Sequence, residues 1–162
     1  MKPVAKKRVL FVCLGNICRS PTAHGVFETL VAQHNLAHLI EVDSAGTAAY
    51  HVGNPPDKRS VAAAQQRGYE LDHLRARQVT AQDFETFDYI LAMDSENLDN
   101  LKSIAPANYQ GYLGLFLSFG QCLESEVPDP YYGGASGFDH VLDLVENASM
   151  GLLLNMQQAL YR

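Results

Sequence analysis

Apolar and polar residues along this chain follow two patterns that predict strands and helices in turn. Residues 8–13 form a short, nearly continuous apolar run, which is typical of a strand buried on both faces of a parallel sheet. Ser20 and Pro21 are typical of a helix start, and apolar residues then recur at three- and four-residue spacing to about residue 34. The same two patterns predict strands at 40–44, 87–93 and 112–116, helices at 57–67, 95–104 and 138–160, and a short helical turn opened by residues 80–83. Gly151 weakens the last of these helices, because glycine disfavours a helix interior.

Strands that alternate with helices predict a parallel sheet. Right-handed crossovers place helices on both faces of such a sheet, so we expect an α/β three-layer sandwich. Ligands of these sheets bind beyond the carboxyl ends of the strands. Cys13 ends the first predicted strand, and we therefore expect an active site there.

The size and composition fit one globular domain over residues 1–162. The chain is 47% hydrophobic and long enough to bury a sizeable core. Its basic start leads into only five apolar residues, too few for a signal peptide or a membrane span, so we expect a cytoplasmic protein without membrane contact. The three cysteines and six histidines show neither a disulfide framework nor metal-ligand spacing, and no cofactor or metal is expected.

The formal charge of −6 is divided unevenly along the chain. Residues 1–81 carry ten Lys and Arg against six Asp and Glu, whereas residues 82–162 carry two against twelve. The acidic balance argues against a nucleic-acid partner. An anionic ligand would favour the N-terminal half.

Residues 13–20 read Cys-Leu-Gly-Asn-Ile-Cys-Arg-Ser and carry the most specific chemistry in the chain. A cysteine beside a helix N-terminus is held as a thiolate, and the N–H groups of such a loop cradle a phosphate. Arg19 offers a planar fork that holds two phosphoryl oxygens at once. Gly15 lets the backbone approach the anion, while Asn16 tolerates a left-handed conformation. We therefore predict Cys13 as nucleophile, Arg19 as a catalytic residue, and a phosphate-binding set of Leu14, Gly15, Asn16, Ile17, Cys18 and Ser20.

A leaving phenolate or alkoxide needs a proton, which this loop cannot supply. Asp129 is the candidate donor, because the prolines at 128 and 130 restrict its backbone and hold the carboxyl group in one place. It would act first as general acid and then as general base toward water. Ser20 is expected to cap the following helix and to donate its hydroxyl to the sulfur of Cys13.

The string CLGNICRSPT resembles the phosphate loop of the low-molecular-weight protein tyrosine phosphatases. Further segments resemble that family in its order, namely residues 43–47, residue 73 with 77–79, residues 87–94 and residues 127–133. The resemblance implies a flavodoxin-like sheet of four parallel strands in the order 2-1-3-4. It also implies hydrolysis of phosphotyrosine in proteins, and of small aryl phosphates, through a phosphocysteine intermediate.

The resemblance also extends to residues outside the loop. It implies Ser44 and His73 as partners of Asn16. Asp94 either braces the loop or caps the next helix. In this interpretation, the aromatic side chains of Tyr50, Tyr131 and Tyr132 flank the leaving group.

Three other functions share parts of this pattern. A thiol-dependent arsenate reductase resembles this family in fold and loop, but it passes a disulfide to mid-chain cysteines, and none lies between Cys18 and Cys122. An arginine phosphatase of the same family typically has threonine where this chain has Ile17. A non-catalytic phosphate-binding module keeps the loop without needing both Cys13 and Asp129.

The expected partners follow from the phosphatase interpretation. They are a phosphotyrosine protein as substrate and inorganic phosphate or another oxyanion in the loop, with the chain a monomer or weak homodimer. Cys18 has two interpretations, either a resolving thiol for an oxidised Cys13 or a small, partly buried residue.

Overall fold

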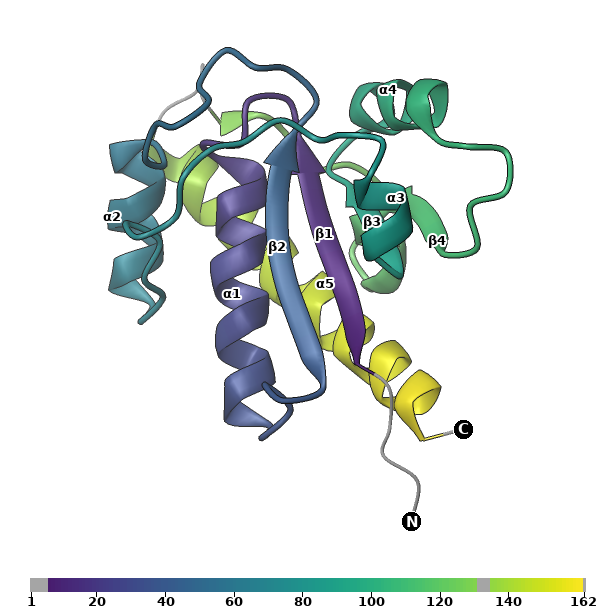
Figure 1. The fold of residues 1–162 in the computed structure, drawn as a ribbon. Coiled ribbons are helices and arrows are strands. Elements are labelled where there is room, and N and C mark those ends of the chain that lie inside the picture. Colours follow the sequence, from purple (N-terminus) through teal and green to yellow (C-terminus); the bar gives the residue numbers. More distant parts are fainter. Residues whose placement is uncertain (1–5, 131–134, 162) are drawn as a thin grey trace.

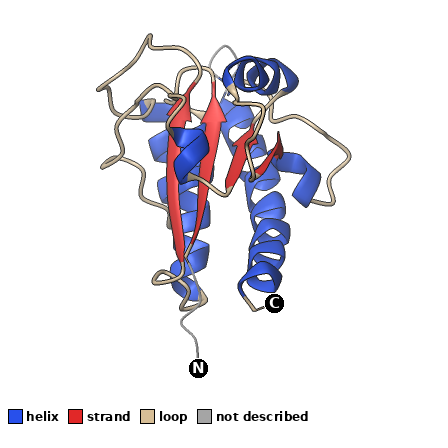
Figure 2. Ribbon diagram, turned by 45° about the vertical axis from the view of Figure 1, so that its right-hand side comes forward, coloured by secondary structure: helices blue, strands red, loops and turns tan. Residues whose placement is uncertain are grey.

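The computed structural model describes residues 6–130 and 135–161 around a four-stranded parallel sheet (Figures 1 and 2). The strands are β1 (Lys7–Cys13), β2 (Ile40–Gly46), β3 (Tyr89–Ala92) and β4 (Tyr112–Leu115). They lie in the order β2-β1-β3-β4, and every neighbouring pair is parallel. The predicted flavodoxin-like order is therefore confirmed, and Figure 2 shows all four strands ending at the same edge of the sheet.

Helices cover both faces of this sheet, as the three-layer prediction requires. One face is covered by α1 (Arg19–Gln33), the 3-10 helix η1 (Phe116–Phe119) and α5 (Ala135–Leu160), and α2 (Lys58–Gln66) packs against α1 and α5 on the same side. The other face packs against α3 (Asp83–Thr86) and α4 (Ser95–Ile104). Within residues 6–130 and 135–161, no helix combines the length and the apolar character needed to cross a bilayer.

Strand β1 lies inside the sheet, and its alternate side chains enter two different apolar clusters. Residues 9–12 are fully buried. Phe11 packs edge-on against Phe27 of α1 and Phe116 of η1, with ring centroids 5.7 and 4.9 Å apart. Leu10 points to the opposite face, under α3 and α4. The unbroken apolar run in the sequence follows from this burial on both faces.

Helix α1 begins two residues before Pro21, its predicted first residue, and Ser20 is not its N-cap. Cys18 occupies the N-cap position and makes no side-chain capping bond. Its carbonyl oxygen instead accepts bonds from the backbone N–H and the hydroxyl of Thr22, at 3.3 and 2.8 Å. The capping prediction for Ser20 is wrong because the Ser20 hydroxyl lies inside the first turn and faces the sulfur of Cys13.

Gly151 does not interrupt the last helix, which runs unbroken from Ala135 to Leu160. A Cβ atom at this position would lie 1.8 Å from the carbonyl oxygen of Phe119. Glycine is therefore required for the close packing of α5 on η1. Tertiary packing here outweighs the low helix propensity of glycine.

Candidate active site

The loop between β1 and α1 carries Cys13 at the end of the central strand. The loop borders a cavity of about 180 Å³ at the carboxyl ends of the strands. The cavity lining consists of Leu14, Gly15, Ile17, Cys18, Arg19, Tyr50, His51 and Asp129. A larger cavity of about 570 Å³, between α3 and residues 104–111, shares none of these residues and has no thiol or guanidinium in its lining. Chemistry rather than size therefore locates the candidate site.

The main chain of this loop is arranged to receive an anion. The carbonyl groups of Cys13, Leu14 and Ile17 turn to neighbouring segments, where they accept bonds from Thr47, Ala48 and Asp57 at 2.8–3.0 Å. Among the residues that the structure describes, the N–H groups of residues 14–18 donate no hydrogen bond. Five adjacent donors are thus available at the helix N-terminus, which is the arrangement that binds phosphate groups.

The sulfur of Cys13 is buried and has one close hydroxyl partner. Cys13 is 3% exposed, and its Sγ lies 3.0 Å from Ser20 Oγ. Ser20 Oγ accepts a bond from Asn16 Nδ2 at 2.7 Å, so its own proton is available for the sulfur or for the Ala45 carbonyl 3.4 Å away. The sulfur is the nearer acceptor. A hydroxyl that donates to sulfur favours the thiolate form.

The side chain of Arg19 is held in place by two groups outside the loop. Its guanidinium is 4% exposed and donates from Nη1 to Asp94 Oδ2 at 2.6 Å and to the Val127 carbonyl at 3.0 Å. The second oxygen of Asp94 accepts the backbone N–H of Asn97 at 2.8 Å, which caps α4. Asp94 therefore performs both roles that the sequence left open. It orients the guanidinium of Arg19 and it caps α4.

Charge at the site keeps Arg19 protonated. Burial lowers the pKa of the guanidinium, but the neighbouring Cys13 and the bond to Asp94 raise it by more. The net effect is a raised pKa. The site thus places a guanidinium that stays protonated close to the sulfur, where its positive charge would stabilise negative charge on that atom.

Asn16 adopts the left-handed conformation that the sequence predicted, with φ of +59°. Its side chain is 2% exposed and makes two bonds. Nδ2 donates to Ser20, and Oδ1 accepts the backbone N–H of Arg77 at 3.0 Å. These two bonds fix the turn of the loop directly beneath the sulfur.

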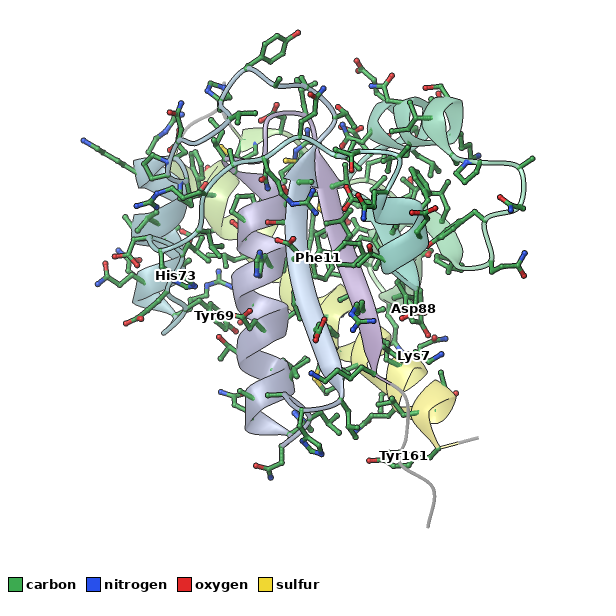
Figure 3. All side chains as sticks on the ribbon, in the orientation of Figure 1. Lys7, Phe11, Tyr69, His73, Asp88 and Tyr161 are labelled. Atoms are coloured by element: carbon green, nitrogen blue, oxygen red, sulfur yellow. The ribbon has the colours of Figure 1, made fainter. Side chains whose placement is uncertain are left out.

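Ser44 and His73, the predicted partners of Asn16, do not bond to it. Ser44 Oγ pairs with His24 Nδ1 at 2.9 Å, and His24 Nε2 lies 3.4 Å from Glu28 Oε2. His73 is exposed, and Figure 3 shows it near α2, apart from the strand ends. The prediction is wrong because the side-chain oxygen of Asn16 is already bonded to the main chain, while Ser44 finds a partner on α1.

Asp129 faces the same cavity from the opposite side. The segment before it is anchored by the backbone N–H of Val127, which donates to the Met93 carbonyl at 2.7 Å. The carboxylate lies 3.9 Å from Arg19 Nη2, and its side chain is 37% exposed. Tyr50 borders the entrance and is 77% exposed. The structure thus brings the predicted acid to the loop of the predicted nucleophile across more than a hundred residues.

Two of the predicted aromatic residues, Tyr131 and Tyr132, lie outside the described residues. A different side chain, His51, lines the cavity and was not predicted. Its ring packs over Gly15, where a Cβ atom would come within 2.9 Å of His51 Cδ2. No local pattern marks His51, because a single histidine in a loop of glycines and prolines has many uses.

Cys18 differs from Cys13 although both lie in the loop. Burial raises the pKa of its thiol to about 12, and the nearby Ser60 hydroxyl offsets this only partly. At neutral pH Cys18 is therefore a neutral thiol. All three cysteines of the chain are free.

The sheet is flavodoxin-like, and the loop after β1 surrounds a cysteine with backbone N–H groups that can bind an anion. This combination is typical of α/β proteins that bind phosphate beside a reactive thiol. The family model for low molecular weight phosphotyrosine protein phosphatase matches residues 8–161. The low molecular weight phosphotyrosine protein phosphatase of Homo sapiens is 46% identical over 143 residues, covering 87% of this chain and 90% of that protein. This chain belongs to the low molecular weight phosphotyrosine protein phosphatase family.

Solved structures agree with this assignment. The protein tyrosine phosphatase of Entamoeba histolytica matches with a TM-score of 0.91 and 40% identity, covering 95% of this chain and 99% of that one. A Drosophila arginine phosphatase matches with a TM-score of 0.85 and 34% identity, covering 91% of this chain and 96% of that one. The fold is therefore shared by proteins named for two different phosphorylated residues.

Proposed function

We propose that this protein hydrolyses phosphotyrosine in proteins, and small aryl phosphates, through a phosphocysteine formed on Cys13. The proposal rests on one observation. Among the described residues, the five backbone N–H groups of residues 14–18 donate no hydrogen bond, and they lie around a buried sulfur. Together with Arg19 they can surround the three non-bridging oxygens of a phosphoryl group, so the negative charge of the transition state is met by groups already in place.

In the first step, the Cys13 thiolate attacks phosphorus in line with the leaving oxygen. The sulfur–phosphorus bond forms as the phosphorus–oxygen bond breaks, and Asp129 transfers its proton to the departing phenol oxygen. Arg19 holds two of the remaining oxygens through its planar guanidinium, whose other edge is bonded to Asp94.

In the second step, water attacks the phosphocysteine. Asp129, now ionised, accepts a proton from this water, and the sulfur–phosphorus bond breaks to release inorganic phosphate and the thiolate. The Ser20 hydroxyl, 3.0 Å from the sulfur, stabilises the thiolate as it leaves. The enzyme returns to its initial state with no change in redox state.

The shape of the cavity supports an aryl phosphate as substrate. The sulfur is nearly inaccessible at the base, so a phosphoryl group must be carried on a long side chain to reach it. Ile17 and Tyr50 border the approach with apolar and aromatic surface. Such surface suits the ring of phosphotyrosine better than a charged guanidinium.

Further parts of the proposal concern setting and assembly. We propose that residues 1–162 act as a single domain, as a monomer or weak homodimer, with phosphate or another oxyanion occupying the loop between turnovers. A reducing compartment such as the cytoplasm is supported by three free thiols, one of them the proposed nucleophile. The acidic net charge of −6 supports a role without nucleic-acid or membrane binding.

The test is a side-by-side assay of phosphotyrosine, phosphoarginine and arsenate in the presence of a metal chelator. We expect turnover of phosphotyrosine, little turnover of phosphoarginine and no thiol-dependent reduction of arsenate. Faster turnover of phosphoarginine would assign the protein to arginine phosphatase activity. Loss of all activity in chelator would contradict a mechanism that relies on amides and Arg19 alone. Phosphate binding without any turnover would indicate a binding module.

A further inference from the structure

Arg77 is bracketed by two carboxylates that come from different parts of the fold. Its Nε and Nη2 lie 3.2 and 3.1 Å from Asp43 Oδ2, at the middle of β2. Its Nη1 and Nη2 donate to the two oxygens of Asp83, the first residue of α3, at 3.1 and 3.0 Å. Asp83 is 7% exposed and also accepts the backbone N–H of Thr80. The planar guanidinium thus ties β2 to α3 with paired bonds, which a lysine could not reproduce.

The main chain of Arg77 is held on its other side by the phosphate loop. Its carbonyl accepts the backbone N–H of Gly46 at 2.8 Å, and its own N–H donates to Asn16 Oδ1 at 3.0 Å. Gly46 makes the close approach possible, because a Cβ atom there would lie 2.7 Å from the Leu14 carbonyl oxygen. The ion pairs of the side chain therefore set where this N–H lies relative to the loop.

A continuous series of contacts leads from this N–H to the sulfur. Asn16 is held in the left-handed conformation, and its Nδ2 donates to Ser20 at 2.7 Å. Because Ser20 Oγ accepts that bond, its proton is left for Cys13 Sγ at 3.0 Å. Without the Arg77 N–H, the Asn16 side-chain amide is free to rotate, and the Ser20 proton loses its direction toward the sulfur.

We propose that Arg77 is a positioning residue for the nucleophile, acting through Asn16 and Ser20 while its side chain is clamped between Asp43 and Asp83. It touches neither the substrate nor the sulfur. The inference rests on the proposed function in that Cys13 is taken as the reactive thiol. It assigns to the Arg77 main chain the place beside Asn16 that the sequence had assigned to Ser44 and His73.

The test compares Arg77→Met with Arg75→Met. Arg75 is a matched control, because it is exposed and, among the residues that the structure describes, its guanidinium bonds only to the nearby carbonyls of Asp72 and Leu74. For each variant, the rate of Cys13 alkylation by iodoacetamide is followed against pH by peptide mass spectrometry, alongside kcat/KM with phosphotyrosine and thermal melting. Alkylation reports the thiolate directly, and a purely structural role would not move its pH profile.

We expect Arg77→Met to move the alkylation midpoint of Cys13 to higher pH and to lower kcat/KM about tenfold, whereas Arg75→Met stays within twofold of the wild type in both. Arg77→Lys is expected to recover part of the shift. An unchanged alkylation profile in folded Arg77→Met, with or without lower melting temperature, would overturn the proposal.

A second variant and the alkylation measurement itself cover two outcomes that the first comparison leaves open. If Arg77→Met does not fold, Asp83→Asn weakens the clamp from the other side while keeping a side-chain oxygen for the Thr80 N–H, and the same upward shift is expected. An unchanged profile there would overturn the proposal equally. If the wild type lacks phosphatase activity, the proposed function fails, but the dependence of Cys13 reactivity on Arg77 is still measured by alkylation alone.

Discussion

The phosphate loop that carries Cys13 and the segment that carries Asp129 meet at one cavity, but in two different settings. On the loop side, Cys13, Asn16 and Arg19 are each less than 5% exposed, and both polar side chains have fixed partners. On the acid side, Asp129 is 37% exposed at its side chain and Tyr50 is 77% exposed. The fold therefore holds the phosphate-binding half firmly and leaves the proton-transferring half at the surface.

This difference corresponds to the two tasks of the site. Charge on the phosphoryl group is best met by donors that need no rearrangement during the reaction, and burial supplies that order. The acid has to reach a leaving oxygen in one step and a water in the next, so solvent access suits it. Substitution of the reactive residue on either side should change the chemistry, and substitutions on the exposed acid side should leave the fold intact.

The largest expected effect is on the loop side, in Cys13→Ser. Turnover of phosphotyrosine should fall by about four orders of magnitude or more, because a serine hydroxyl in this loop is not ionised at neutral pH. Affinity for inorganic phosphate, measured by titration calorimetry, should stay within a few-fold, since the amides and Arg19 are unchanged. Retained turnover would remove Cys13 from the role of nucleophile.

On the acid side, Asp129→Asn should lower kcat for phosphotyrosine by about 10²- to 10⁴-fold, the range that general acid catalysis supplies. The loss should be much smaller with 4-nitrophenyl phosphate, because its leaving group departs without a proton. The melting temperature should be unchanged, given the exposure of the side chain. Equal losses with both substrates would contradict the assignment of Asp129 as acid.

Substitutions of Asp94 test whether its role in orienting Arg19 can be separated from its role in stabilising α4. Asp94→Asn should lower kcat/KM about tenfold, because Arg19 loses a charged partner at 2.6 Å, yet it should barely change thermal melting, since asparagine is also a good N-cap. Asp94→Ala should lose the same activity and also about 1 kcal/mol of stability. If both variants keep full activity, Asp94 is a helix cap only.

The smallest expected effect is at the entrance, in Tyr50→Ala. We expect KM for phosphotyrosine to rise about two- to tenfold with kcat nearly unchanged, because an exposed ring contributes binding that is the same in ground state and transition state. Steady-state kinetics with inorganic phosphate as inhibitor provides the control, since phosphate does not reach Tyr50. A fall in kcat without a change in KM would place Tyr50 in the chemical step instead.

Sequence periodicity predicted most of the fold because each element carries its own signal. The apolar run of β1 and the apolar spacing of α1 are local features that survive in the structure. Ser20 shows where local reasoning fails, because a serine before a helix has two possible uses. The sequence predicted both the helix cap and the contact with the sulfur of Cys13, and the structure contains only the contact with the sulfur.

The supporting network of the site was less predictable than its reactive residues. Cys13, Arg19 and Asp129 require particular functional groups at particular places, so their residue types identify them. The partner of Asn16 is a backbone N–H, which every residue except proline carries, and no residue type could identify it. Likewise His24 is one of six histidines, and only the packing of α1 on β2 brings it to Ser44.

The sequence by itself determined the parallel α/β order, the phosphate loop at the end of β1 and the need for an acid outside that loop. These follow from hydrophobic periodicity and from chemistry that only certain side chains can perform. The tertiary structure alone decided that Asp129 meets the phosphate loop at Arg19, that Asp94 serves both Arg19 and α4, and that Arg77 rather than His73 supports Asn16. Hydrogen bonds between distant segments depend on ångström-scale placement, which is set by the packing of the whole domain and has no local signal in the chain.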